Sequence, residues 1–136
     1  MTGLIADERP ETIEDLKNGR GTVNYNHNIQ EILVKEEEGG SWEIVTDPEE
    51  ATGTKFMYDC LRVEYPITRN NILATLITAK YDANTESKLV NDYQAAMIGI
   101  LDESFKEPYI AFLRDRLAMK QMVENDCVPI GIPEKL

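Results

Sequence analysis

Hydrophobic and polar positions alternate between Phe56 and Tyr65, and a period of two is typical of a β-strand. Pro66 cannot donate a ladder hydrogen bond, so we expect the strand to end before it. Thr68 then stands where a helix N-cap is preferred. Apolar side chains recur after it at helical spacing, at Ile72, Leu73, Leu76 and Ile77. The segment 56–81 therefore predicts a strand, a turn and a helix.

Upstream of this segment the pattern predicts a β-hairpin. Residues 29–35 and 41–46 carry apolar side chains between polar ones, and Gly39-Gly40 between them suits a tight turn. In the hairpin, residues 32–37 pair with residues 42–46. The strand at 56–65 then follows as the third strand of an antiparallel meander.

The first 28 residues have a less regular pattern. Residues 10–17 fit a short helix that stops at Gly19, or an arm that becomes ordered only against a partner. Residues 23–28 (VNYNHN) are rich in asparagine, which favours turns and loops because its side chain hydrogen-bonds the local backbone. We therefore expect turns and loops at residues 23–28.

The second half of the chain has the pattern of two further helices. One is expected over 86–100, with an apolar stripe that includes Met97 and Ile100, and the other over 108–125. The apolar sector of the last helix is wide, which indicates contacts with both other helices or with another molecule. Its candidate interface consists of Phe112, Met119, Met122 and Val123.

Together these elements predict an α+β fold, in which a small antiparallel meander is followed by three helices packed on one another and on one sheet face. The expected organisation is an N-terminal arm at 1–28, ordered on a partner, and a single domain at 29–136. Within that domain, strands occupy 29–65, helices occupy 68–125, and an extended tail occupies 126–136.

The charge of the chain is strongly negative and unevenly distributed. Its 136 residues carry a net charge of −11. Residues 1–66 hold 15 acidic and 6 basic side chains, whereas residues 67–136 hold 10 and 8. This sign repels phosphate backbones and argues against nucleic-acid binding. The candidate acidic surface consists of Glu36, Glu37, Glu38, Asp47, Glu49 and Glu50.

The sequence contains no recognisable catalytic, cofactor or metal motif. His27 is the only histidine, and Cys60 and Cys127 lack a CxxC partner. Asp47 and its neighbours lack the spacing and glycine of a calcium loop, and no glycine-rich nucleotide motif is present. We therefore predict no catalytic, cofactor or metal residues, and a protein that is not an enzyme.

Residues 56–127 resemble small proteins of gut bacteria and their prophages, in which a YD-x-LRV-x-YP strand end precedes a T-x-x-NI-x-x-TL-x-x-AKY helix. The arrangement is also similar to accessory proteins encoded among phage tail genes. The matching residues are Tyr58, Asp59, Leu61, Arg62, Val63, Tyr65, Pro66, Thr68, Asn71, Ile72, Thr75, Leu76, Ala79, Lys80 and Tyr81. The resemblance implies a structural or assembly role and carries over no site residue.

Our functional expectation is a non-enzymatic interaction protein, a structural or assembly component of a phage or prophage that binds copies of itself or other virion proteins. The alternative is an acidic inhibitor or mimic that binds a basic site on a bacterial target. The chain has neither a signal peptide nor an apolar run of membrane-spanning length. We therefore expect synthesis in the bacterial cytoplasm, association with the virion, and no membrane partner.

Overall fold

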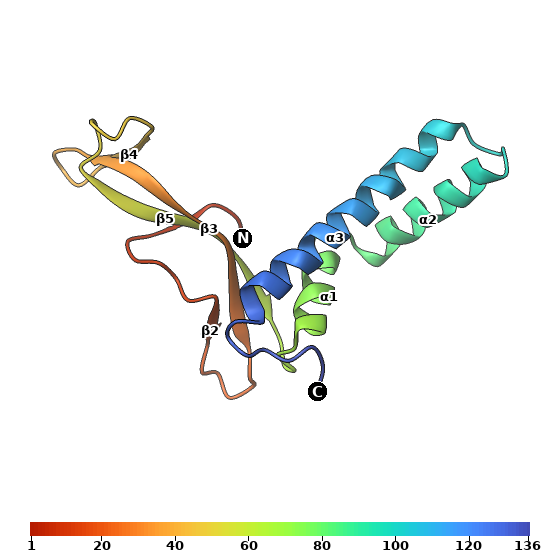
Figure 1. Ribbon diagram of the computed structural model, residues 1–136, viewed down its shortest axis with the longest axis horizontal. Helices are drawn as coiled ribbons and strands as arrows, with labels where there is room; N and C mark the ends of the chain where they lie inside the picture. Colours follow the sequence, from red (N-terminus) through yellow and green to blue (C-terminus); the bar gives the residue numbers. More distant parts are fainter. The chain divides into compact units, whose positions relative to one another are not determined.

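The computed structural model describes all residues from 1 to 136, which form two compact units, Met1–Tyr65 and Pro66–Leu136 (Figure 1). The first, the sheet unit, is a five-stranded antiparallel sheet, and the second, the helical unit, contains three α-helices. The predicted α+β fold is therefore confirmed. The division at residue 65 differs from the expected boundary after residue 28, because residues 1–28 contribute strands to the sheet.

The sheet unit is built on two long strands with three short strands beside them. Its strands are β1 (Leu4–Ala6), β2 (Ile13–Asp15), β3 (Val23–Glu36), β4 (Trp42–Val45) and β5 (Gly53–Val63). The long strands β3 and β5 pair with each other, as Figure 1 shows. β1 adds to the free edge of β5, while β2 and β4 pair with different halves of the other edge of β3.

The predicted hairpin is confirmed, but the strand order of the predicted meander is wrong. β3 and β4 pair with Leu33 opposite Val45. β5 pairs with β3 instead of β4, and Gly53 lies opposite Val34 on the second edge of β3. Residues 46–52 must therefore cross one face of β3 to join β4 to β5. They cross at the level of Val34, whose side chain is fully buried.

A β-bulge interrupts the β3–β5 pair between His27 and Gln30. Asn28 lies in this bulge with a φ of 49°, a left-handed conformation that asparagine adopts more readily than most residues. Its side-chain amide donates to Asp59 Oδ2 across the pair at 2.9 Å. The segment 23–28 is therefore a strand that ends in a bulge, and the prediction of loops there is wrong.

The predicted short helix at residues 10–17 is also wrong, because β2 occupies its centre. Two asparagines of β3 hold this part of the chain in place. The Asn24 side chain donates to Glu14 Oε1 at 3.0 Å, and the Asn26 side chain donates to the Glu11 carbonyl at 2.8 Å. The asparagine side chains thus bond a neighbouring strand and not only their own turn.

The helical unit contains the three expected helices. They are α1 (Arg69–Lys80), α2 (Ala83–Met97) and α3 (Glu107–Cys127), and a short 3-10 helix, η1 (Glu103–Lys106), precedes α3. As predicted, Thr68 caps α1, and its Oγ1 accepts from the Asn71 amide at 3.1 Å. Asp82 caps α2 by accepting from the Thr85 amide at 2.7 Å, so α2 begins and ends earlier than the predicted 86–100.

An aromatic and aliphatic core holds α1, α2 and α3 together. Ile77 of α1 packs with Phe112 and Met119 of α3, and half-buried side chains from all three helices surround them: Leu73, Leu76, Tyr81, Leu89 and Tyr109. The Tyr81 ring meets the edge of Phe112 with ring centroids 4.8 Å apart. Burial of these large side chains supplies the main stabilisation of the helical unit.

The C-terminal tail covers the start of α1. The first backbone amides of that helix have no partner within the helix. Here the Arg69 amide donates to the Pro133 carbonyl at 2.8 Å, and the Asn70 amide donates to the Glu134 carbonyl at 3.2 Å. The extended tail predicted for residues 126–136 is wrong over its first half: α3 continues to Cys127, and residues 128–131 form a turn.

Candidate interaction surfaces

The outer surface of the helical unit has two shallow hollows, one along α1 and one along α2. Their lining residues are Asn71, Ala74, Thr75, Thr78 and Ala79 on α1, and Ala83, Glu86, Ser87, Val90 and Asn91 on α2. Glu86 is the only ionisable side chain among them. Both hollows are open to solvent, so neither has the enclosed, water-excluding shape of a typical small-molecule site.

The His27 side chain packs inside the sheet unit. Its ring is nearly buried and stacks on Tyr25 with ring centroids 4.6 Å apart. Its Nδ1 lies 3.0 Å from the Tyr25 carbonyl, which can only accept, so Nδ1 carries the proton in this contact. In no part of the chain do three or more histidine, cysteine, aspartate or glutamate side chains converge to hold a metal ion.

The two cysteines are free thiols with suppressed ionisation. Burial and, to a smaller extent, the nearby Asp126 carboxylate raise the pKa of the Cys127 thiol to about 11. Burial also raises the pKa of Cys60. Because the thiolate is the reactive form, both groups are protonated and weakly nucleophilic at neutral pH.

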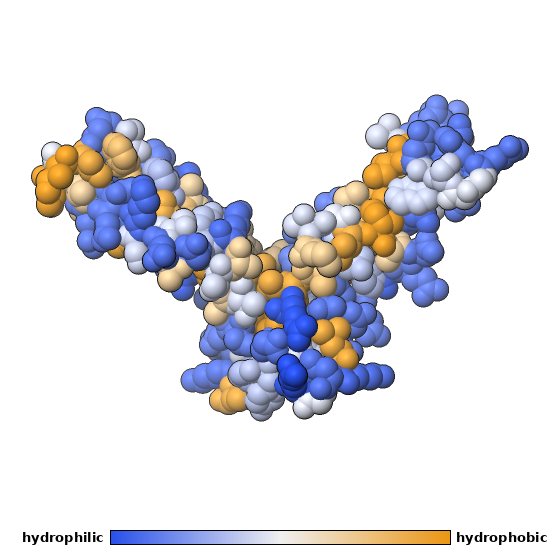
Figure 2. Space-filling model, turned by 180° about the vertical axis from the view of Figure 1, so that it is seen from behind, coloured by the Kyte–Doolittle hydropathy of each residue, from blue (hydrophilic) through white to orange (hydrophobic).

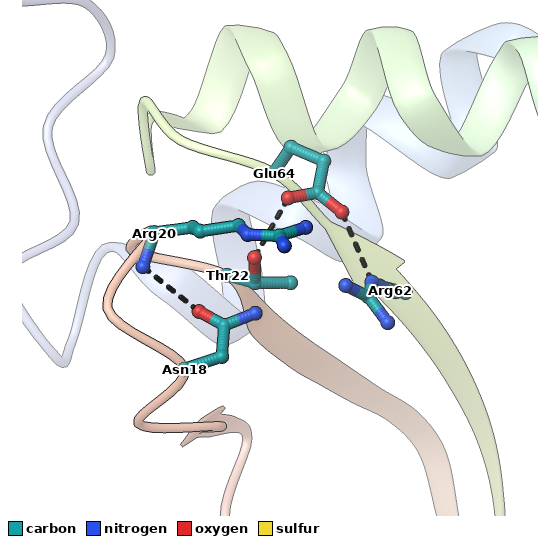
Figure 3. A network of polar contacts seen from close by, with 5 residues as sticks. All are labelled: Asn18, Arg20, Thr22, Arg62 and Glu64. Carbon is teal, nitrogen blue, oxygen red and sulfur yellow. Dashed lines mark hydrogen bonds and ion pairs between the residues drawn. The ribbon is translucent and has the colours of Figure 1, made fainter.

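A polar network links the segment before β3 to the residue after β5 (Figure 3). Thr22 Oγ1 donates to Glu64 Oε2 at 2.7 Å, and Arg62 Nε donates to Glu64 Oε1 at 3.0 Å. These two hydrogen bonds lower the pKa of Glu64. Beside them the Arg20 backbone amide donates to Asn18 Oδ1 at 3.0 Å. Structural hydrogen bonds thus occupy the carboxylate, and the network ties two strands together.

The structure places most of the candidate interface of the last helix inside the protein. Phe112 and Met119 belong to the core of the helical unit, Val123 is buried, and Met122 is half-buried. The prediction that these side chains form an interface is therefore wrong for Phe112, Met119 and Val123, because all three are buried in the protein itself. The apolar side chains of α3 that do face solvent are Leu113 and Leu117.

All six residues of the candidate acidic surface are exposed. They lie at one end of the sheet unit, on three segments that the pairing brings together: the end of β3, the β3–β4 turn, and the crossing segment 46–52. Two exposed apolar side chains of β4, Trp42 and Ile44, lie among them. The sheet therefore presents an acidic surface that includes exposed apolar side chains.

The largest apolar side chains exposed on the helical unit gather where α2 passes into α3. We call this surface the hairpin end, and it consists of Met97, Ile98, Ile100 and Phe105. Figure 2 shows it as a hydrophobic cap on the tip of the two helices. Ile98 and Ile100 are 73% and 72% exposed. Between them Gly99, with a φ of 80°, turns the chain out of α2.

Comparison with known proteins yields no relative. No protein-family model matches the chain, and neither a curated protein sequence nor a solved structure is detectably similar to it.

Sequence reasoning missed the hairpin end because it assigned Met97 and Ile100 to the buried stripe of a helix over 86–100. α2 ends at Met97, so Ile100 lies beyond the helix and does not continue its apolar stripe. The signal in the sequence was Gly99, because glycine commonly marks a helix end.

None of the helices has the length and apolar character needed to cross a lipid bilayer.

Proposed function

We propose that this chain is a non-enzymatic interaction protein that self-associates through the hairpin end. The observation that carries the proposal is the exposure of Met97, Ile98, Ile100 and Phe105 within one short connection. Single exposed apolar residues are normal on soluble proteins, whereas adjacent ones mark contact surfaces. Removing them from water stabilises a contact by roughly 25 cal/mol per Å² of apolar area.

A second copy is a suitable partner for the hairpin end. Two copies related by a two-fold axis would bring the same apolar patch together, which is the commonest arrangement in homodimers. Within this connection the Glu103 carboxylate is paired with the Lys106 ammonium at 3.0 Å, which offsets one of its negative charges. Residues 67–136 are close to neutral, with 10 acidic and 8 basic side chains.

The biological role that we propose is a structural or assembly component of a phage or prophage. Its support is the resemblance of residues 56–127 to small prophage and tail-region proteins, together with the hairpin end. A part of this kind would act by joining copies of itself, or other virion proteins, into a larger structure.

The experiment is light scattering on the purified full-length protein at several concentrations, each at low and high salt. We expect an oligomer whose population rises with concentration and persists at high salt, since apolar contacts are not screened. At high salt, the double variant Ile98→Ser/Ile100→Ser should be monomeric at concentrations where the native chain associates. Ile130→Ser, an exposed isoleucine on the tail, is the matched control. A native chain that is monomeric throughout, or a high-salt oligomer that the double variant leaves unchanged, would overturn the proposal.

A second candidate function is an acidic mimic that binds a basic site on a bacterial protein. The observation in its favour is that the six predicted acidic residues are all exposed at one end of the sheet. Replacing Glu36, Glu37, Asp47 and Glu49 with lysine should abolish capture of such a target while the far-UV circular dichroism stays unchanged. Binding that survives the four substitutions would refute this function.

A further inference from the structure

The solvent-facing side of α3 combines apolar and basic side chains. Leu113 and Leu117 are 44% and 56% exposed, and because they are four residues apart they lie one turn apart on one face. By helical geometry Arg114 lies on one side of this leucine pair, and Arg116 and Lys120 lie on the other. All three basic side chains are exposed. We call these five residues the α3 face.

The positive charges of the α3 face form no ion pair, although Lys120 lines a small pocket together with Glu124 and Glu134. Three other lysines of the helical unit are paired: Lys80 with Asp115 at 2.6 Å, Lys88 with Asp92 at 2.7 Å and Lys106 with Glu103 at 3.0 Å. None of Arg114, Arg116 and Lys120 forms such an ion pair. In a chain with a net charge of −11, the α3 face is a locally basic surface.

A surface of complementary character exists on the same chain, at the acidic end of the sheet. β4 is an edge strand, since it pairs only with β3, and it exposes Trp42 and Ile44. Glu36, Glu37 and Glu43 lie on or beside this edge, and all three are exposed. We call these five residues the β4 edge. Both surfaces therefore combine apolar side chains with charges, and these charges are of opposite sign. Glu36 lies opposite Trp42, whereas Glu43 lies on the other face of β4, opposite Lys35.

We propose that the α3 face of one copy binds the β4 edge of a second copy. The inference rests on the proposed self-association and adds a second contact to it. Two β4 edges would repel each other, as would two α3 faces, so like surfaces are disfavoured as partners. A contact between two different surfaces of the same chain repeats from copy to copy and yields a ring or a filament.

The proposed contact between the α3 face and the β4 edge has charged side chains at its rim, which distinguishes it from the apolar contact of the hairpin end. Exposed ion pairs are screened by salt, whereas apolar burial is not. Association through the α3 face should therefore weaken as salt rises. The Lys55 ammonium lies 5.2 Å from the centre of the Trp42 ring, and the Asp7 carboxylate, with which it is paired, offsets its positive charge beside the β4 edge.

The test uses charge reversal and mixing, in full-length protein that also carries Ile98→Ser/Ile100→Ser. This background removes the hairpin-end contact, so failure of one proposal is distinguishable from failure of the other. One variant carries Arg114→Glu/Arg116→Glu/Lys120→Glu, and the other carries Glu36→Lys/Glu37→Lys/Glu43→Lys. All six positions are exposed, and far-UV circular dichroism checks that the fold is retained.

In sedimentation at low salt, the background protein should associate with increasing concentration, and each triple variant alone should weaken this by about tenfold or more. An equimolar mixture of the two variants should associate again, because a basic β4 edge then meets an acidic α3 face. The control Arg9→Glu/Lys17→Glu/Lys135→Glu makes the same change in net charge as the α3-face variant, at exposed positions elsewhere, and should leave association unchanged.

Four results would overturn the proposal. The first is a mixture that stays monomeric while the background protein associates, and the second is association that neither triple variant weakens. The third is a background protein that is monomeric at every concentration at low salt. Loss of association in the control variant as well would attribute the effect to net charge and would equally refute the specific contact.

Discussion

The Tyr81 hydroxyl, at the end of α1, donates to Asp115 Oδ2 on α3 at 2.8 Å. The same carboxylate oxygen accepts from the Lys80 ammonium at 2.6 Å. Two consecutive residues of one helix end therefore bond a single carboxylate of the facing helix. The contact sets how α1 lies against α3, beside the Phe112 ring that the Tyr81 ring also touches.

Tyr81→Phe removes the hydroxyl but keeps the ring. We expect the free energy of unfolding to fall by about 0.5 to 1.5 kcal/mol, the usual net contribution of one hydrogen bond. Urea denaturation at neutral pH measures this change. Tyr58→Phe is the matched control, since Tyr58 is a half-buried tyrosine of β5. A loss as large in the control as in Tyr81→Phe would show that the Tyr81 hydroxyl has no particular role.

The Asp115 carboxylate should make stability depend on pH in the acidic range. The hydrogen bond from Lys80 lowers its pKa, burial opposes this, and the bond from Tyr81 lowers it further. Because the pKa is lower in the folded than in the unfolded chain, where it is about 4, the carboxylate stabilises the fold above that pH. The stabilisation is lost as the pH falls through the folded pKa.

The measurement for Asp115 is the difference in unfolding free energy between the native chain and Asp115→Asn across a pH series. The native chain should be the more stable at pH 7, and the difference should shrink steadily in acid. A difference that stays constant from neutral to acidic pH would contradict the assignment.

Thr22→Val replaces a buried hydroxyl with a methyl group of similar size. The hydroxyl holds the pKa of Glu64 down together with Arg62. We expect the Glu64 pKa to rise towards its ordinary value in Thr22→Val, which NMR titration of the side-chain carboxyl carbon measures. Thr22→Ser keeps the hydroxyl and should keep the lowered pKa. An unchanged pKa in the valine variant would mean that Arg62 alone accounts for the shift.

Thr68→Ala removes the N-cap of α1. The Asn71 amide then loses its acceptor, and such losses cost about 1 kcal/mol, with a range of about 0.5 to 2. Thermal or urea unfolding should show the loss, and Thr68→Ser should recover most of it, since serine is an equally good cap. Equal loss in the serine variant would indicate that the Thr68 methyl group, and not the cap, matters.

Substitutions at Phe112 and Leu117 test which side of α3 packs into the core. Phe112→Ala should reduce the free energy of unfolding by about 3 to 5 kcal/mol, because it leaves a cavity beside Ile77 and Met119. Leu117→Ala changes an exposed side chain and should cost about 0.5 kcal/mol or less in the monomer. Similar losses for the two variants would contradict the burial pattern of the helix.

The sequence alone predicted the elements whose signals are local. The strand that ends before Pro66, the Thr68 cap and the three helices all follow from residues within a few positions of one another. Hydrophobic period, proline chemistry and capping each act over one or two turns, which explains why these predictions are confirmed. The hairpin at Gly39-Gly40 is likewise predicted by residues close to one another in the sequence.

Signals that depend on distant partners were misread. Asparagines favour turns when their side chains bond the nearby backbone, but Asn24 and Asn26 bond residues of the β2 region, and Asn28 bonds Asp59. The apolar residues of α2 and α3 look alike in sequence, and only the packing decides that Phe112 is buried while Met97 is exposed.

The sequence by itself thus determined the class of the fold, its local elements and its uneven charge. The tertiary structure decided that β5 pairs with β3, that residues 1–28 belong to the sheet, and which apolar side chains remain for a partner. The physical reason is the range of the interactions. Local backbone preferences are set by neighbours along the chain, whereas strand pairing and burial depend on groups that only the folded chain brings together.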